Sequence, residues 1–515
     1  MEERVNVSDN PKWIGLCMAQ AHTFLKDDFL CELDRVARDA GYALLVFNSS
    51  MDWYWSHHGG NITGCIYDMI RYDRLSALII LHGDIYDPEQ LDRMIHCARE
   101  QKIPVLYLGG RHPLCTSIID DYAEPYKELI RHIIRDHQVR DCFYIAGLKG
   151  EDNSSLRLRC WQEVMEEFGL PCGEEFYAYG NYLDVIAVQI VQSLVEEREK
   201  LPRAIFCAND SMAAAICDFL QRAGIRIPED VIVTGFDGTP TAYLIQPQLT
   251  TCASNPGELA RLVMDRILSF DPSKEEKEPP VLTHQYKTVL TGSCGCAPFV
   301  HERFTGIHTL RKTEALFNHE NTLYYVVDQL LEEKDLYGFL GRLAVLLLPG
   351  SALYLNRSLL ESNPDTVHMP DHPEDELIMI PHCEADHPPA LRKVYLRDMP
   401  LPSESSSGVT VLNIVHSDVR VCGYYAAHTE NLDVDAQLIK RLSDVLNLIA
   451  SVQLGRVRQQ QLVAKLENNL YIDSIAGLSN LKGLTRWYEQ YSAAETGRAR
   501  PLALSVYSIC RYNYI

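Results

Sequence analysis

Three polar residues within the stretch 204–251 have the placement of ligand-binding groups. A short apolar run precedes Asn209 and Asp210, apolar residues then recur at helical spacing over 212–223, and a second apolar run precedes Asp237. This order predicts a βαβ unit with a right-handed crossover between parallel strands. Because open α/β sheets bind ligands at the carboxyl ends of their strands, we expect a small-molecule site at this edge.

The same stretch resembles the effector-binding domain of the lactose-repressor family, which has the fold of the periplasmic sugar-binding proteins. The resemblance depends on the ordered segments ANDSMAAA, GIRIPEDVIVTGFDG and PQLTT, and it extends over residues 12–298. It implies a two-lobed α/β receptor, of the type I periplasmic-binding-protein class, that closes on a small polar ligand.

The resemblance also implies which residues contact the ligand. Arg157 matches the arginine of the family's R-x-x-G-[FYW] pattern, Asn209 the asparagine of its ND pair, and Asp237 the aspartate of its GFD turn. Asp121 and Tyr122 lie where the family places ligand-facing groups, and Phe29, a further candidate, starts the segment that matches the family's first helix. An arginine fork and a carboxylate suit vicinal hydroxyls or a purine-like edge, and each charge-assisted bond contributes roughly 1.5–3 kcal/mol.

Some of these residues also have ordinary structural explanations. Asp210 suits the N-cap of the helix that follows it, Asp237 suits a turn, and Arg157 suits a surface ion pair. The sequence also departs from the family pattern, since Cys160 replaces the usual glycine and Tyr122 and Pro125 replace asparagine and glycine. We therefore do not expect the ligand to be the family's common sugar.

Composition limits the remaining functions. The 515 residues allow roughly two to four domains, and the formal net charge of −22 disfavours binding to nucleic acid or to an anionic membrane. Several of the 16 cysteines lie in apolar runs, as buried free thiols do: Cys17, Cys65, Cys207 and Cys217. The start of the chain has no signal-peptide pattern, and the apolar stretch 343–355 is too short to span a bilayer. A cytoplasmic protein is expected.

A lactose-type repressor carries a helix-turn-helix of about 50 residues before its receptor, whereas the first receptor strand here starts by Ile14. On that basis we expect no DNA partner. A ligand-responsive transcription regulator remains an alternative.

The pair Cys294 and Cys296 closes the receptor segment. With His284 and His301 nearby, it offers four possible zinc ligands, but the spacing matches none of the common frameworks. We therefore expect no metal and no cofactor.

Residues 315–435 form a second module, in which a helical segment is followed by several strand-like segments. This order resembles a GAF-type sensory domain with an α+β fold, and no chromophore cysteine or ligand motif stands out. A structural or dimerising role is the alternative to sensing.

Residues 436–470 are predicted to form a coiled-coil helix. Leu438, Leu442 and Ile449 belong to a 4-3-4-3 apolar repeat, interrupted at Arg456 and Gln459, that would pair two protomers over 438–470. The alternative is an amphipathic helix packed on its own domain.

Residues 471–515 resemble the beginning of a GGDEF diguanylate cyclase domain. The resemblance implies an aspartate ligand for Mg²⁺ at position 508, where this chain has Ser508, a poor ligand for a hard cation. The sequence also ends before the guanine-reading residues. We therefore expect a catalytically incompetent α/β fragment and no enzyme activity, unless the gene continues past residue 515.

These observations together predict a cytosolic homodimeric sensor that binds a sugar-like or nucleoside-like ligand and relays closure to an inactive GGDEF-type output. The alternatives are a diguanylate cyclase encoded by a longer gene and a transcription regulator.

Overall fold

The computed structural model describes residues 12–21, 24–49, 62–85, 87–197, 201–274, 278–296, 336–357, 373, 375–384, 390–398, 408–417, 420–432, 435–452 and 482–486. The chain divides into two compact units, and the larger contains every described residue through 450. The second unit contains the described residues 451–452 and 482–486, of which 482–486 form a short helix. The expected GGDEF-like strand at 502–507 lies outside the described residues.

Lobe 1 of the receptor is built on a parallel sheet. Its strands are, in spatial order, β11 (Val281–Gln285), β5 (Thr116–Asp121), β4 (Val105–Leu108), β3 (Leu75–Leu81), β1 (Lys12–Ala19) and β2 (Tyr42–Ser49). Its helices are α1 (Phe24–Asp39), α2 (Pro88–Glu100) and α8 (Pro256–Ser269), with the short 3₁₀ helices η1 (Ile62–Met69) and η2 (Tyr72–Arg74). Seven of the eight residues of β1 are buried, as in a parallel strand covered on both faces.

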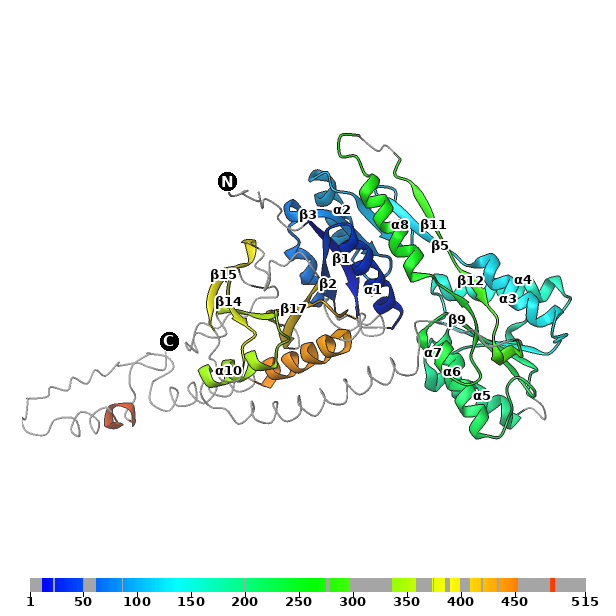
Figure 1. Cartoon of the computed structure of the whole chain (residues 1–515). Coiled ribbons are helices and arrows are strands. Elements are labelled where there is room, and N and C mark those ends of the chain that lie inside the picture. Colours follow the sequence, from blue (N-terminus) through cyan, green and yellow to red (C-terminus); the bar gives the residue numbers. More distant parts are fainter. Residues whose placement is uncertain are drawn as a thin grey trace, which may run out of the picture. The chain divides into compact units, whose positions relative to one another are not determined.

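Lobe 2 is built on a second sheet, which is parallel except for one antiparallel edge strand. The strands are, in spatial order, β12 (Lys287–Val289), β10 (Thr250–Ala253), β9 (Ile232–Asp237), β8 (Ala204–Cys207), β6 (Cys142–Ala146) and β7 (Tyr177–Tyr179). The helices are α3 (Ala123–Arg135), α4 (Asp152–Glu167), α5 (Asp184–Glu197), α6 (Asp210–Arg222) and α7 (Pro240–Leu244), with the 3₁₀ helices η3 (Glu174–Phe176) and η4 (Gly292–Cys294). Helices α3 and α4 cover one face of the sheet, and α5 to α7 lie on the other (Figure 1).

The chain passes between the lobes three times. It leaves lobe 1 after β5, returns to it after β10, and crosses again between β11 and β12. The predicted βαβ unit is present, since β8 and β9 pair in parallel and α6 connects them. The two-lobed α/β architecture expected from the sequence is therefore confirmed.

The described part of the second module is an antiparallel sheet with helices. It contains α10 (Leu336–Leu346), β13 (Ala352–Asn356), β14 (Glu376–Pro381), β15 (Arg392–Tyr395), the 3₁₀ helix η5 (Leu396–Asp398), β16 (Val409–Ser417) and β17 (Arg420–Thr429). Strand β16 pairs in parallel with β2 of lobe 1, so the two sheets form one eleven-stranded sheet. The α+β character matches the expectation, and the GAF identity stays a prediction.

The predicted coiled-coil seam is largely buried within this same unit. Residues 435–452 are helical, and Leu438, Leu442 and Ile449 are 6%, 1% and 5% exposed. The Asn447 side chain accepts a hydrogen bond from the main-chain N–H of His416 in β16 at 2.9 Å. For this part of the helix the burial favours the alternative, an amphipathic helix packed on its own domain. The coiled coil over 438–470 stays a prediction. A stripe of this length fits a heptad repeat and a 3.6-residue period equally well. Residues 453–470 lie outside the described part.

Among the described residues, no helix combines the length and apolarity that a membrane span requires. Cys17, Cys65, Cys207 and Cys217 are buried as free thiols, as the sequence predicts. A cytoplasmic location stays a prediction.

Candidate functional site

A cavity of about 420 Å³ lies between the two lobes of the receptor. Lobe 1 contributes Asp28, Phe29, His82, Asp84, Asp120 and His284 to its lining, and lobe 2 contributes Asn153, Arg157, Asp237, Thr239 and Tyr243. Polar side chains of both lobes thus face one space. A ligand that fills it would touch both lobes, as closure of a two-lobed receptor requires.

Arg157 and Asp237 form the centre of the lobe 2 wall. Arg157 Nη2 lies 3.3 Å from Asp237 Oδ1, and the two side chains are 12% and 11% exposed. The guanidinium carbon of Arg157 lies 3.6 Å from the ring centroid of Phe236, so an aromatic face supports the charged group. The buried Nε of Arg157 has no hydrogen-bond acceptor among the described residues. The arginine therefore keeps a donor for a further polar partner.

Asp237 is held in an unusual state. Its backbone φ is +108°, in the region that favours glycine, at the point where β9 ends. Burial raises the pKa of the Asp237 carboxyl to about 6, against the opposing effect of the Arg157 guanidinium. Backbone strain combined with a perturbed carboxyl is more typical of a functional position than of an ordinary turn.

Asn209 has a structural role in α6. Its side chain accepts a hydrogen bond from the main-chain N–H of Met212 at 3.0 Å and so caps the helix. This corrects the suggestion that Asp210 is the cap. Asn209 is not part of the cavity lining, and its predicted contact with ligand has no support in this geometry.

Asp210 lies beneath the cavity and is fully buried. It accepts hydrogen bonds from Thr239 N at 2.7 Å, Thr239 Oγ1 at 3.1 Å and Thr251 Oγ1 at 2.7 Å. Burial, with a smaller contribution from the nearby Asp237, raises the pKa of this carboxyl to about 7. The Asp210 carboxyl fixes the turn that presents Asp237 and Thr239.

The lobe 1 wall uses Asp120 in place of the predicted Asp121. Successive side chains of a strand point to opposite faces, and in β5 it is Asp120 that lines the cavity. Asp120 Oδ1 lies 2.9 Å from Nδ1 of His284, a residue of β11 that is 1% exposed. Asp121 is exposed and accepts a hydrogen bond from the Gln285 side chain at 3.1 Å. His284 therefore belongs to this site and not to the pair Cys294 and Cys296.

The remaining predicted residues support the cavity in different ways. Phe29 of α1 lies in its lining and is 5% exposed. Tyr122 packs edge to face on Phe236 and its hydroxyl donates to Asn153 Oδ1 at 3.0 Å, so it lies behind Arg157. The phenol occupies the place expected for a smaller asparagine and helps to fix the Arg157 guanidinium.

Sequence reasoning missed Asp120, His284, Asn153 and Tyr243. The carboxylate Asp120 was adjacent to a predicted residue, and strand alternation was the signal that separates the two. Asn153 and Tyr243 carry no pattern of their own in the sequence. They reach the cavity because α4 and α7 start at its edge.

The fold and this cavity define a periplasmic-binding-protein-like receptor domain. The chain matches the periplasmic binding protein-like domain family over residues 131–294. This match supports the periplasmic-binding-protein-like domain expected from the sequence. The lactose-repressor type of that domain stays a prediction.

Several curated proteins are similar to the receptor half. The HTH-type transcriptional repressor PurR of Photobacterium profundum is 24% identical over 262 residues, covering 50% of this chain and 74% of that protein. Catabolite control protein A of Priestia megaterium is 26% identical over 211 residues, covering 41% of this chain and 61% of that protein. By name, these relatives are a transcriptional repressor and a catabolite control protein.

Solved structures give matches of the same extent. A dimeric Lac repressor is 19% identical with a TM-score of 0.46, covering 56% of this chain and 100% of that one. The transcriptional regulator CelR in complex with cellobiose is 20% identical with a TM-score of 0.43, covering 55% of this chain and 85% of that one.

Proposed function

We propose that this protein is a ligand-responsive regulator whose receptor closes on a small, uncharged polar molecule. The observation that carries the proposal is the Arg157 and Asp237 pair, which faces the same cavity as Asp120 of the opposite lobe. A ligand that bonds to both walls stabilises the closed state more than the open one. That difference in affinity is what shifts a two-state equilibrium.

The charges of the lining indicate the class of ligand. Four carboxylates and one guanidinium line the cavity: Asp28, Asp84, Asp120, Asp237 and Arg157. This acidic excess opposes a phosphate or carboxylate ligand, which would be repelled in a partly desolvated site. Phe29 and Tyr243 add apolar surfaces for a ring. Sugars and nucleosides without a phosphate group fit these conditions best.

A thermal-shift screen of sugars, nucleosides and amino acids, each beside its phosphorylated form where one exists, tests this proposal. We expect a neutral compound to raise the melting temperature and its phosphorylated form to have little effect. Titration calorimetry then measures binding of the hit to Arg157→Ala and Asp120→Asn. Each loss of a charge-assisted bond costs roughly 1.5–3 kcal/mol, or roughly 10- to 100-fold in affinity.

Arg159→Ala is the matched control, because Arg159 is exposed on the same helix α4. It should bind the hit as the wild type does. Wild-type affinity in both Arg157→Ala and Asp120→Asn would show that the ligand binds elsewhere.

The output of the regulator is a separate proposal. The curated relatives are named transcriptional repressors and a catabolite control protein, which supports regulation of transcription more than a GGDEF-type output. The net charge of −22 weighs against a nucleic-acid surface in this chain itself. An electrophoretic shift assay on genomic fragments at physiological salt, with and without the hit, tests this output. A homodimer, the absence of enzyme activity and the GGDEF resemblance remain proposals.

A further inference from the structure

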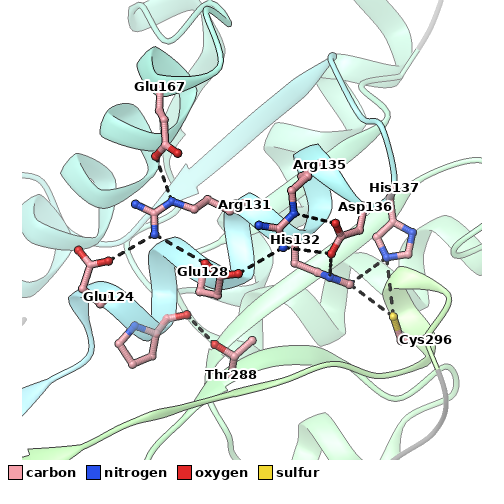
Figure 2. Close-up of polar contacts among 11 residues, drawn as sticks. Glu124, Glu128, Arg131, His132, Arg135, Asp136, His137, Glu167, Thr288 and Cys296 are labelled. Carbon is pink, nitrogen blue, oxygen red and sulfur yellow. Dashed lines mark hydrogen bonds and ion pairs between the residues drawn. The ribbon is translucent and has the colours of Figure 1, made fainter.

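Four metal-binding side chains gather at the far end of lobe 2, away from the ligand cavity. His132 lies in the last turn of α3, His137 follows that helix, and Cys294 and Cys296 lie in and just after η4. Their ligand atoms all lie within 4.8 Å of one another. Figure 2 shows the rings of His132 and His137 directed at the sulfur of Cys296.

We propose that these four residues bind one zinc ion as a tetrahedral Cys₂His₂ site. Bonds of about 2.3 Å to sulfur and about 2.0–2.1 Å to nitrogen place the ligand atoms of tetrahedral zinc roughly 3.3–3.8 Å apart. Here the two Nε2 atoms are 3.0 Å apart, and Cys296 Sγ lies 3.4 Å from His132 Nε2 and 3.7 Å from His137 Nε2. Shifts of a few tenths of an ångström bring these three ligand atoms to the metal geometry. All four ligand atoms lie within 4.8 Å of one another, so Cys294 Sγ needs a shift of at most about 1 Å.

The surroundings orient the histidine ligand. Nδ1 of His132 lies 2.8 Å from Asp136 Oδ2, and Arg135 donates to the other oxygen of the same carboxylate at 2.8 Å (Figure 2). A carboxylate on one ring nitrogen leaves the opposite nitrogen free of its proton and directed at the metal. Asp136 is thus a positioning residue for His132.

The cysteine turn is held rigidly before any metal arrives. Gly295, between the two cysteines, has φ +96°, which allows the tight turn that brings both thiols to one side. Ser293 is buried, its N–H donates to Gln248 O at 2.8 Å, and its hydroxyl donates to Val233 O at 2.6 Å. Little ordering entropy is then lost when zinc binds.

The site has both the charge balance and the access that zinc requires. Two thiols lose their protons to solvent as the ion binds, and two thiolates and two neutral imidazoles leave no net charge at the site. Cys294 is buried, whereas Cys296, His132 and His137 are half-buried and give solvent a path to the centre. The ion would connect the C-terminal end of α3 to the turn that contains Cys294 and Cys296. The same helix begins at Ala123, directly after Tyr122, which lies behind the ligand cavity.

Metal analysis of the full-length, untagged protein tests the site. Protein purified with a reductant and supplemental zinc, then desalted, should retain about one zinc per chain. Cobalt substitution should give the strong visible absorption of tetrahedral coordination and a thiolate charge-transfer band. Cys296→Ser should lose the zinc and the thiolate-dependent spectrum, while Cys172→Ser, a half-buried cysteine of the same lobe, should keep both.

Asp136→Asn tests whether Asp136 positions His132 for zinc, because a purely structural role of Asp136 would not change the zinc affinity in a graded way. It should weaken zinc affinity roughly 10- to 100-fold, measured by competition with a chelator, and leave the stoichiometry unchanged. A chelator should lower the melting temperature of the wild type and not that of Cys296→Ser. Should that variant not fold, the cobalt spectrum of the wild type decides. A wild type without that spectrum, equal metal in wild type and Cys296→Ser, or a Cys294–Cys296 disulfide under reducing conditions would each overturn the proposal.

Discussion

The side chain of Asn48 in β2 donates a hydrogen bond to Asn413 Oδ1 in β16 at 2.6 Å, which ties the receptor to the second module through buried amides. The other end of the Asn48 amide accepts from the main-chain N–H of Ala21 at 2.9 Å. These bonds accompany the parallel pairing of β2 with β16. A change in lobe 1 therefore has a direct mechanical connection to the module that follows it.

Asn48→Ala should destabilise the protein by about 1–3 kcal/mol, because it leaves a buried N–H of Ala21 and the Asn413 carbonyl without partners. A double-mutant cycle with Asn413→Ala, measured by urea unfolding, should give a coupling free energy of at least about 0.5 kcal/mol. Strictly additive effects would show that the two amides do not interact in solution.

Asp210 should make the stability fall as the pH rises. The pKa of Asp210 is about 7 in the folded state, which exceeds the unfolded value of about 4. Between about pH 4 and pH 7 the carboxyl is therefore protonated in the folded state and ionised in the unfolded state. Stability contributed by the protonated form is therefore present at low pH and lost as the pH rises through about 7.

The free energy of unfolding of Asp210→Asn, minus that of the wild type, should increase by on the order of 2 kcal/mol when the pH is raised from 5 to 8. Urea unfolding at the two pH values measures this difference. Asp218→Asn, on the same helix but paired with Arg222 at the surface, should show no such change. A pH-independent difference between Asp210→Asn and the wild type would mean that the carboxyl ionises freely in the folded state.

Gly423 should tolerate no side chain. Its φ is +147°, and a Cβ added there would lie 1.9 Å from Tyr354 O across the pairing of β13 with β17. Gly423→Ala should lower the free energy of unfolding by at least about 2 kcal/mol. Gly257→Ala in α8, where the nearest atom is 3.5 Å away, should stay within about 0.5 kcal/mol of the wild type. Equal stability of the two variants would mean that β17 does not approach β13 this closely at Gly423.

Leu442→Ala should act on folding and not on association. The residue is 1% exposed within its own chain, and such a truncation costs about 2–5 kcal/mol. Leu448→Ala, at a position that is 56% exposed, should have little effect on the melting temperature. Melting temperatures recorded over a wide range of protein concentrations distinguish an effect on folding from an effect on association. If the loss of melting temperature in Leu442→Ala depended on protein concentration, Leu442 would contribute to pairing between protomers.

Local patterns in the sequence were enough to predict the βαβ unit with Asp237 at a strand end, and the family resemblance implied the two-lobed receptor and the candidate Arg157. Apolar runs and helical spacing are encoded within a few residues of one another, and the resemblance supplied the order of the segments. The same information placed Phe29 and Tyr122 close to the site. Buried cysteines were also predictable, because their apolar neighbours are adjacent in the chain.

The tertiary structure decided everything that depends on contacts between distant segments. Asp120 and not Asp121 faces the cavity because the register of β5 against its neighbours selects one face of the strand. His284 pairs with Asp120, and the two cysteines meet His132 and His137, because separate crossings between the lobes bring those segments together. The apolar stripe of residues 435–450 packs on its own unit for the same reason. Spacing along the chain fixes which residues share a face, and only the assembled fold fixes what that face meets.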